Sequence, residues 1–158
     1  QYFICHVNSK LKDSKIDLKK DLKLENKYKL KNKKTFYKFI KNIDKNKKKI
    51  LKLLVNLKDK NKSIHGYGAS TKGNVLLQYF GIGDKIIDYI SERNPQKFNC
   101  YTPGTKIKII SEKKSRSLKP DYYLVLPWHF KDEILKREKF IRKKGVKFIF
   151  PLPSLKII

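Results

Sequence analysis

Apolar residues recur at intervals of three, four or seven positions through the first half of the chain. The residues that share this spacing are Phe36, Phe39, Ile40, Ile43, Ile50, Leu51, Leu54 and Leu57. The spacing places them on one face of a helix of about seven turns, with lysines on the opposite face. Asn32 or Thr35 is suited to cap the start of this helix. We expect the apolar face to pack against the domain that follows rather than to lie on a membrane surface.

From Ser63 onward, short apolar runs alternate with amphipathic segments. The expected strands cover residues 63–68, 85–90, 106–110, 121–126 and 146–150, and the expected helices cover residues 70–80, 111–118 and 128–144. Gly81 and Gly145 stand where the first and last of these helices should end, and Ser111 is suited to cap the second. This alternation predicts an α/β fold, with a Rossmann-like parallel sheet flanked by helices and preceded by the long Lys-rich amphipathic helix.

The pattern divides the chain into three parts. Residues 1–7 are rich in strand formers and are expected to be the last strand of a truncated domain. Residues 8–62 form a basic segment, which we expect to be an interdomain helical segment, although its low complexity would also suit disorder. Residues 63–158 form the Rossmann-like C-terminal domain. Because the chain opens at Gln1 and contains no methionine, we expect it to be a fragment of a longer protein.

Lysine dominates the charge of the chain, which has a formal net charge of +26. Only four of the 40 basic residues are arginines, and Ala69 is the single alanine. Specific recognition of nucleic-acid bases favours the bidentate fork of arginine. Abundant Lys, Asn and Ile with scarce Ala is instead typical of an AT-rich genome. Codon bias therefore explains the charge better than selection for nucleic-acid binding, although weak, salt-sensitive attraction to polyanions is expected.

The sequence offers little for metal, disulfide or membrane chemistry. Cys5 and Cys100 lack the spacing of metal ligands, and so few cysteines suit a reducing, cytoplasmic location. His6 and His65 lie within predicted strands, and we interpret both as structural. No apolar run reaches the roughly 18–20 residues of a membrane span. Since no paired carboxylates or serine triad can be assembled either, the chain is predicted to bind rather than to catalyse.

A glycine-rich loop joins the first expected strand of the domain to its first helix. The candidate binding residues there are Gly66, Tyr67, Gly68, Ser70, Thr71, Lys72, Gly73 and Asn74. Glycines let backbone N–H groups approach an anion, and the helix N-terminus adds partial positive charge. Asn74 stands where a triphosphate-binding loop has lysine, and Gly73 comes two residues later than in the dinucleotide fingerprint. The loop therefore predicts contact with a phosphate or nucleotide, with a purely structural turn as the alternative.

Three other loops follow the expected strands at the edge where ligands of doubly wound sheets bind. Their candidate binding residues are Glu92, Arg93, Asn94, Thr105, Trp128 and His129. An acid after the second strand, Glu92 or Asp88, is placed to hold ribose hydroxyls. Trp128 and His129 suit stacking on a base or sugar. Ordinary surface turns, a buried tryptophan and a capping histidine are the alternatives.

Four ordered blocks resemble the C-terminal domain of the sugar C-methyltransferase family. They are GYGASTKGNVLLQYFGI, YISERNPQKFNCYTPGTKIKII, PDYYLVLPWHF and GVKFIFPLP, within residues 63–153. The resemblance implies a protein of three parts: a zinc-binding domain, a middle domain that binds S-adenosylmethionine, and this Rossmann-like domain. It implies methyl transfer to a sugar carbon beside a keto group, with the base, the cofactor site and the zinc ligands all in parts that this sequence lacks.

The resemblance implies that the glycine-rich loop and the loops at Arg93, Thr105 and Trp128–His129 face a nucleotide-diphospho-sugar. The expected partners are therefore that substrate and a preceding methyltransferase domain, without a metal, a membrane or a specific nucleic acid. Two other hypotheses remain open. One is a module that binds a nicotinamide dinucleotide, and the other is a polyanion-binding module that uses the Lys-rich helix.

Overall fold

A computed structural model of the chain describes residues 18–158. The strand expected at residues 1–7, with Cys5 and His6, lies outside them. Contacts divide the chain into two units at Lys41 and Asn42. The first unit holds α1 (Leu18–Lys27) and the start of α2 (Lys33–Asp59). Asn32 caps α2 as predicted, because its Oδ1 accepts the Lys34 N–H at 2.9 Å.

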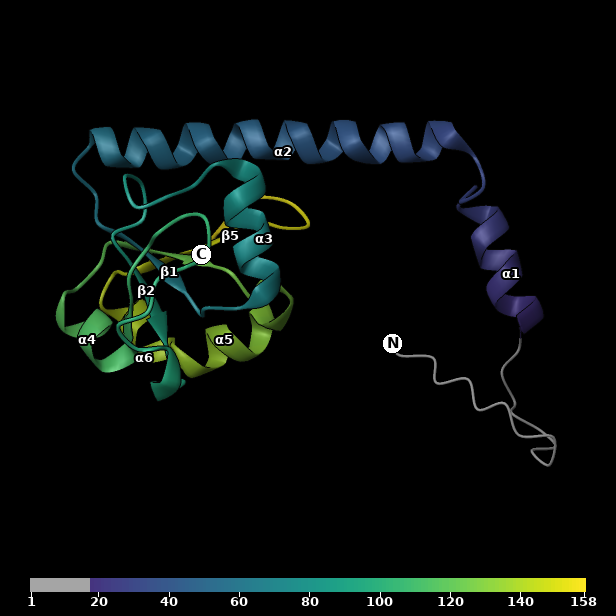
Figure 1. The fold of residues 1–158 in the computed structure, drawn as a ribbon. Helices are drawn as coiled ribbons and strands as arrows, with labels where there is room; N and C mark the ends of the chain where they lie inside the picture. The colour runs from purple at the N-terminus through teal and green to yellow at the C-terminus, as the bar shows by residue number, and fades with distance from the viewer. Residues whose placement is uncertain (1–17) are drawn as a thin grey trace, which may run out of the picture. The chain divides into compact units, whose positions relative to one another are not determined.

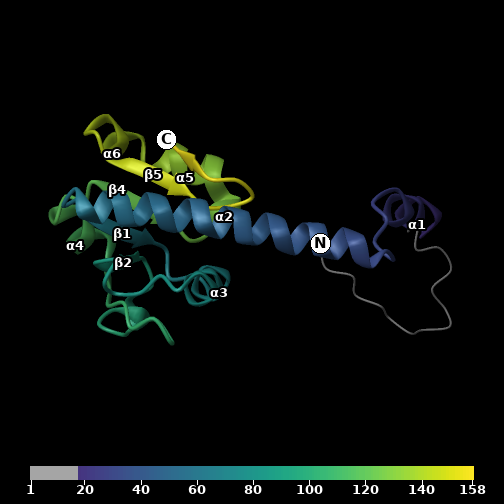
Figure 2. The same ribbon diagram turned by 90° about the horizontal axis from the view of Figure 1, so that it is seen from above.

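The second unit is built on a six-stranded sheet in the order β3-β2-β1-β4-β5-β6. The strands are β1 (Ile64–Tyr67), β2 (Tyr89–Glu92), β3 (Ile109–Ser111), β4 (Tyr122–Val125), β5 (Lys147–Phe150) and β6 (Lys156–Ile157). Figure 2 shows β2, β1, β4 and β5 side by side in this order. All pairings are parallel except that of β6, which runs antiparallel to β5. This is the doubly wound order, and the Rossmann-like prediction is confirmed.

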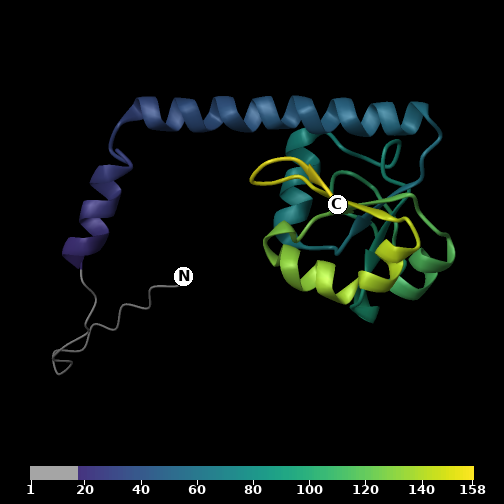
Figure 3. The same ribbon diagram turned by 180° about the vertical axis from the view of Figure 1, so that it is seen from behind.

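Helices cover both faces of the sheet (Figure 1). The second part of α2 and α3 (Thr71–Phe80) cover one face. The other face carries α4 (Glu112–Ser117), α5 (Lys131–Arg137) and α6 (Lys139–Lys143). Figure 3 shows α5 and α6 from behind, on the side of the sheet away from α2. Short 3-10 turns, η1 (Pro95–Lys97) and η2 (Trp128–Phe130), complete the described elements.

Alternation along the strands separates two apolar cores. In β1, Ile64 faces the core that α2 and α3 cover, and Tyr67 faces the core beneath α5. The first core includes Ile50, Leu54 and Leu57 of α2, all buried. By contrast, Phe36, Phe39 and Ile40 of α2 are about half exposed. The prediction that the apolar face of this helix packs against the domain therefore holds only for its second part.

Polar contacts fasten the end of α2 to the sheet. Lys58 Nζ lies 2.9 Å from Asp88 Oδ1, and the Ile64 N–H donates to Asp88 Oδ2 at 2.9 Å. Burial opposes ionisation of Asp88, but the Lys58 ammonium, the Ile64 amide and the Ser63 hydroxyl outweigh it and lower the pKa of this carboxyl. Asp121 acts similarly, because it accepts the Ser63 N–H at 2.9 Å. Two carboxylates thus fix the point where β1 begins.

Three predicted elements differ from those observed, and one is the strand expected at residues 106–110, which is β3 at Ile109–Ser111. The second strand of the domain is β2 at Tyr89–Glu92 rather than residues 85–90, because Ile87 is buried in a turn and Asp88 binds the amide of Ile64. The last predicted helix, over residues 128–144, is interrupted at Glu138, so η2, α5 and α6 replace it. No helix within residues 18–158 is long and apolar enough to cross a membrane.

Candidate functional site

Two cavities open beside the glycine-rich loop, at the carboxyl edge of the sheet. The first, which we call the switch-point cavity, has a volume of about 380 Å³ and lies where the strand order reverses between β1 and β4. The second, the α3 cavity, has a volume of about 270 Å³ and lies beside the start of α3. Gly68 lines the first cavity and Ala69 and Ser70 line the second, so the loop forms the ridge between them.

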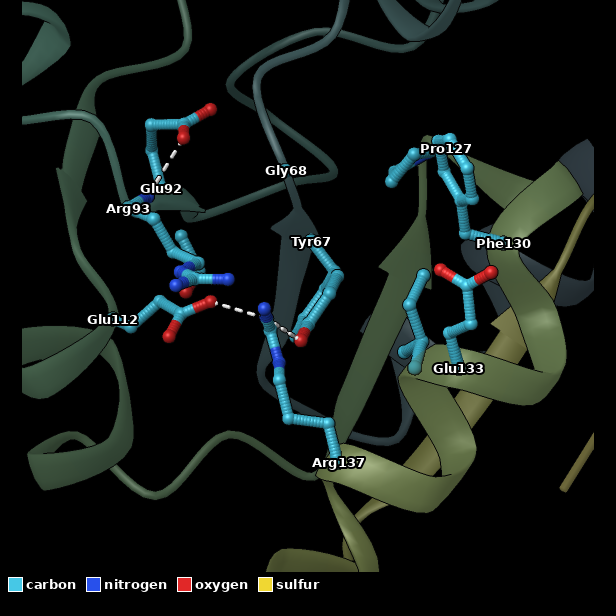
Figure 4. A pocket seen from close by; sticks show the side chains of 11 residues that line it. Tyr67, Gly68, Glu92, Arg93, Glu112, Pro127, Phe130, Glu133 and Arg137 are labelled. Carbon is cyan, nitrogen blue, oxygen red and sulfur yellow. Dashed lines mark hydrogen bonds and ion pairs between the residues drawn. The ribbon is translucent and has the colours of Figure 1, made fainter.

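The switch-point cavity combines charged and aromatic walls. Its lining residues are Tyr67, Gly68, Ser91, Glu92, Arg93, Glu112, Pro127, Phe130, Glu133, Ile134 and Arg137. Figure 4 shows Arg93 and Glu112 on one side of Tyr67, with Phe130 and Glu133 on the other. Aromatic and carboxylate groups beside an arginine suit a ligand that carries both an anion and hydroxyl groups.

A buried ionic network forms the floor of this cavity. Glu138 is 2 % exposed, and its Oε1 accepts hydrogen bonds from the Tyr67 hydroxyl at 2.7 Å and from Arg116 at 2.9 Å. Arg137 also contacts Glu138, donates to the Tyr67 hydroxyl and lies 2.6 Å from Glu112 Oε1. Burial and then the hydrogen bond to Glu138 strongly raise the pKa of Tyr67, so it stays protonated. The network therefore holds the side chains at the floor of the cavity in place.

Arg93 differs from the arginines of that network. Arg116 and Arg137 are each paired with Glu112 and Glu138. In contrast, no ion pair or hydrogen bond holds the Arg93 guanidinium within residues 18–158, and its side chain is exposed at the cavity (Figure 4). A guanidinium without a carboxylate partner presents five N–H donors in a fork that matches phosphate. Of the two arginines that line the cavity, Arg93 is therefore the one whose guanidinium has no partner among residues 18–158.

Most backbone N–H groups of the glycine-rich loop already donate hydrogen bonds to other groups of the protein. Gly68 N–H donates to Ser91 O at 2.8 Å, Ala69 N–H to Glu92 Oε2 at 2.7 Å, and Ser70 N–H to Gly68 O at 3.0 Å. Gly73 N–H donates to Ser70 Oγ, so Ser70 is the N-cap of α3. The Thr71 and Lys72 amides occupy the first two helical positions, which have no partner within a helix. Only these two amides of residues 68–74 remain available to an anion.

Close packing explains two of the predicted loop glycines. A Cβ at Gly66 would overlap Ile90 Cδ1, and a Cβ at Gly73 would overlap Leu126 Cβ. Gly68 has a φ of +80°, a conformation that side chains rarely adopt. The structural alternative therefore accounts for these glycines, and the loop's remaining capacity for a phosphate lies at the start of α3.

Glu92 organises both loops at this edge. Its carboxylate accepts N–H groups from Ala69, Arg93 and Asn94, at 2.7, 2.7 and 3.0 Å. Burial alone would raise the pKa of Glu92, but these amides and the nearby Lys97 ammonium lower it below its ordinary value. Glu92 therefore stays ionised and holds the loop after β1 against the loop after β2. With three amides already bound, it is poorly placed to hold a ribose as well.

The α3 cavity collects other predicted residues. It is lined by Ala69, Ser70, Thr71, Asn74, Leu77, Lys97, Thr102, Pro103, Ile109 and Leu126. Lys97 Nζ is held by Ala69 O at 2.9 Å. Asn74 Oδ1 is buried without a hydrogen-bond partner in the described part of the chain. A buried polar atom without a partner costs about 1–3 kcal/mol and calls for an explanation.

The remaining predicted residues lie apart from the two cavities. Lys72 is exposed and, with the half-buried Trp128, borders a separate groove along α3. Asn94 caps η1, where its Oδ1 accepts the Gln96 N–H at 3.1 Å. Thr105 lies 2.7 Å from the Thr102 hydroxyl and lines a different hollow. His129 is exposed, and its ring centroid lies 4.3 Å from that of Phe130 with the rings tilted by 45°.

Sequence analysis did not single out Glu112, Phe130, Glu133 and Arg137. Glu112 is the first residue of α4 and the other three lie at the start of α5 or within it, where charged residues are common and carry no local signature. Glu112 and Phe130 come soon after expected strands, at the edge where ligands collect, and this position is a signal for both. Glu133 and Arg137 lie farther along α5 and carry no such signal. Within the described residues, no group of three or more His, Cys, Asp or Glu side chains could hold a metal ion.

Comparison with known proteins agrees with this architecture. The family model of the C-methyltransferase C-terminal domain matches residues 1–153. The chain belongs to this family. It is also similar to C-methyltransferase NovU of Streptomyces niveus, with 38 % identity over 97 residues. The similarity covers 61 % of this chain but 23 % of that relative, so the chain spans about a quarter of the length of the relative it matches. The family resemblance inferred from the four sequence blocks is confirmed.

Proposed function

We propose that this C-methyltransferase C-terminal domain holds a nucleotide-diphospho-sugar for an S-adenosylmethionine-dependent methyltransferase. The observation that carries the proposal is the Arg93 guanidinium of the switch-point cavity, which is unpaired among residues 18–158, and we combine it with the two free amides at the start of α3. A diphosphate bound between them would take charge-assisted hydrogen bonds from both. The sugar would then lie among Tyr67, Phe130 and Glu133.

We infer that the methyl donor binds to another part of the protein. In a Rossmann-like fold, the ribose of a bound nucleoside cofactor is held by an acid after the second strand. Glu92 occupies that position, and its oxygens already accept three backbone N–H groups. The same commitment weighs against a nicotinamide dinucleotide. We therefore place the donor and the base that deprotonates the sugar in a domain preceding residue 1, with residues 8–62 as the connection.

Such a division gives the domain a positioning role in catalysis. Binding energy from the remote diphosphate and base would hold the sugar carbon in line with the methyl donor. The chain alone would bind substrate without methylating it. Because a nucleotide-diphospho-sugar is a water-soluble substrate, we propose that the protein acts in the cytoplasm.

Isothermal titration of the chain with uridine diphosphoglucose and thymidine diphosphoglucose tests the proposal. Replacing Arg93 by Gln should weaken binding by about tenfold to a hundredfold, since a hydrogen bond to a charged group contributes about 1.5–3 kcal/mol. Arg142→Gln is a matched control, because Arg142 lines neither cavity and its change removes the same charge. Equal affinity of wild type and Arg93→Gln for both sugars would refute the assignment.

A further inference from the structure

A further cavity opens at the amino edge of the sheet, opposite the edge that carries the glycine-rich loop. This amino-edge cavity has a volume of about 330 Å³ and lies beside the ends of α4 and α6. Asp121 and Val146 line it, and they directly precede β4 and β5. It shares no lining residue with the switch-point cavity or the α3 cavity. A ligand here would therefore bind apart from the edge at which doubly wound sheets collect their ligands.

Apolar side chains form one part of the lining of the amino-edge cavity. Pro120 is buried, and Ile141 and Val146 are half-buried. Phe140 is 67 % exposed, and no other large apolar side chain within residues 18–158 is as exposed. An exposed phenylalanine ring beside a hollow is stabilised when a second ring covers it, because contact removes apolar surface from water.

Positive side chains with unused donors form another part of the lining. Within residues 18–158, no ion pair or hydrogen bond engages the Nζ of Lys119 or Lys144, and Lys144 Nζ lies 4.3 Å from the centre of the Phe140 ring. Arg116 forms both of its ion pairs through Nη2, which leaves the donors on Nε and Nη1 unused among the same residues. The cavity thus has three cationic groups that can each donate to an anion.

The acidic residue of the lining does not neutralise these cations. Asp121 Oδ1 lies 3.0 Å from Lys62 Nζ, and Asp121 Oδ2 accepts the Ser63 N–H at 2.9 Å. Positive groups gathered around a small hollow repel one another, and a bound anion would relieve that repulsion. Basic residues are abundant throughout the chain, so their presence alone indicates no site. The coincidence of unneutralised cations with an apolar hollow and an exposed ring is what points to a ligand.

We propose that the amino-edge cavity binds a small aromatic anion. Its ring would lie against Phe140, and its charged group would take hydrogen bonds from Lys119, Lys144 and the unused donors of Arg116. The volume of the cavity is at the lower end of the range for small-molecule sites, so it suits a compact ring system rather than a nucleotide-sugar. The inference is independent of the proposed function, because the two sites share no residue.

Fluorescence titration of the chain with 2-naphthoate and its neutral analogue 2-naphthamide tests the proposal. The anion should bind about tenfold more tightly than the amide, and its affinity should fall as the salt concentration rises. Phe140→Ala should weaken 2-naphthoate binding about fivefold by removing the ring contact. Phe36→Ala, which removes an exposed ring from α2, is the matched control and should leave binding unchanged. Equal affinity of wild type and Phe140→Ala overturns the inference.

A second pair of variants tests the charged part of the cavity. Lys144→Gln should weaken 2-naphthoate binding about threefold, a modest change because an exposed ion pair contributes little free energy. Lys143→Gln removes the same charge one residue earlier, from a side chain that does not line the cavity, and should have no effect. Equal weakening by the two variants would show attraction to the general positive charge of the chain and would overturn the site.

Two-dimensional ¹H–¹⁵N NMR locates the bound anion and separates this inference from the proposed function. Titration with 2-naphthoate should shift the amides of Asp121, Gly145 and Val146 most, and Arg93→Gln should leave its affinity unchanged. Shifts centred on the glycine-rich loop, or a loss of 2-naphthoate binding in Arg93→Gln, would place the anion in the switch-point cavity and overturn the inference. A failure of nucleotide-sugars to bind would refute the proposed function alone.

Discussion

The buried histidine of β1 makes the stability of the domain depend on pH. His65 is 1 % exposed, and its Nδ1 lies 2.8 Å from Ser115 Oγ, which in turn lies 2.8 Å from the Tyr123 hydroxyl. Burial lowers the pKa of His65 to about 4, with a smaller opposing effect of Asp88. The folded protein therefore keeps this imidazole neutral across a range in which the unfolded chain protonates it.

The magnitude follows from the difference between the two pKa values. The ordinary histidine pKa of about 6.5 against about 4 in the folded state corresponds to about 3 kcal/mol. Because the folded pKa is lowered, this stability is fully present above pH 6.5. It is lost progressively as the pH falls from 6.5 to 4, where the unfolded state takes up the proton.

Urea unfolding of the wild type and of His65→Gln between pH 7 and pH 4, followed by circular dichroism, measures this effect. The wild type should lose about 3 kcal/mol more than the variant over that interval, since effects of carboxyl groups are common to both and cancel. Ser115→Ala is the control. It should cost about 1–3 kcal/mol at every pH by leaving buried polar groups unpaired, but it should retain the acid loss. Parallel curves for wild type and His65→Gln would refute the reasoning.

Three further substitutions test the packing and the ion pairs. Gly73→Ala should lower the free energy of unfolding by about 1–3 kcal/mol in urea titrations, because a Cβ there overlaps the Cβ of Leu126, just after β4. Gly83→Ala, whose Cβ would meet its nearest atom at 3.4 Å, should lower it by less than about 1 kcal/mol. Asp88→Asn should lower the free energy of unfolding by about 1 kcal/mol at pH 7, because it removes the partly exposed ion pair with Lys58. Since folding lowers the pKa of Asp88, this difference from wild type should disappear as the pH falls through that pKa. Glu138→Gln should cost about 2 kcal/mol by weakening the buried network, seen as a lower thermal midpoint, and an unchanged midpoint would contradict the role of that network.

Local signals were sufficient for much of the fold. Ser111 caps α4 as predicted, and Gly81 ends α3 in the left-handed conformation, as expected of a glycine at that place. These features depend on residues within one turn of each other, so the sequence carries them directly. The alternation of strands and helices likewise sufficed for the doubly wound sheet.

Other features depend on partners far away in the sequence. The start of β2 is set by Asp88 binding the amide of Ile64, and apolar spacing alone extended the strand too early. Glu138, where the last predicted helix is interrupted, binds Tyr67 of β1 and Arg116 of α4, which lie far from it in the sequence. β6 was missed because two residues are too few for a pattern.

The candidate site likewise combines residues that local signals indicate with residues that only distant contacts bring together. Gly68, Glu92 and Arg93 stand at the carboxyl ends of strands, so the rule that ligands collect at that edge is enough to bring them together at the switch-point cavity. Whether Glu92 is free for a ligand or bound to backbone amides depends on how two loops meet, and sequence spacing does not contain that information. Glu133 and Arg137 lie on a helix among many other charged residues, and only the packed structure brings them to the cavity.

The central claim is that the switch-point cavity and the start of α3 together hold a nucleotide-diphospho-sugar. Two-dimensional ¹H–¹⁵N NMR of the chain, including the arginine Nε–H signals, tests it most directly during titration with thymidine diphosphoglucose. We expect the largest shifts at the Arg93 Nε–H and at the amides of Gly68, Thr71 and Lys72. Shifts confined to the Lys-rich α2, or an Arg93 signal that does not move at saturation, would contradict it.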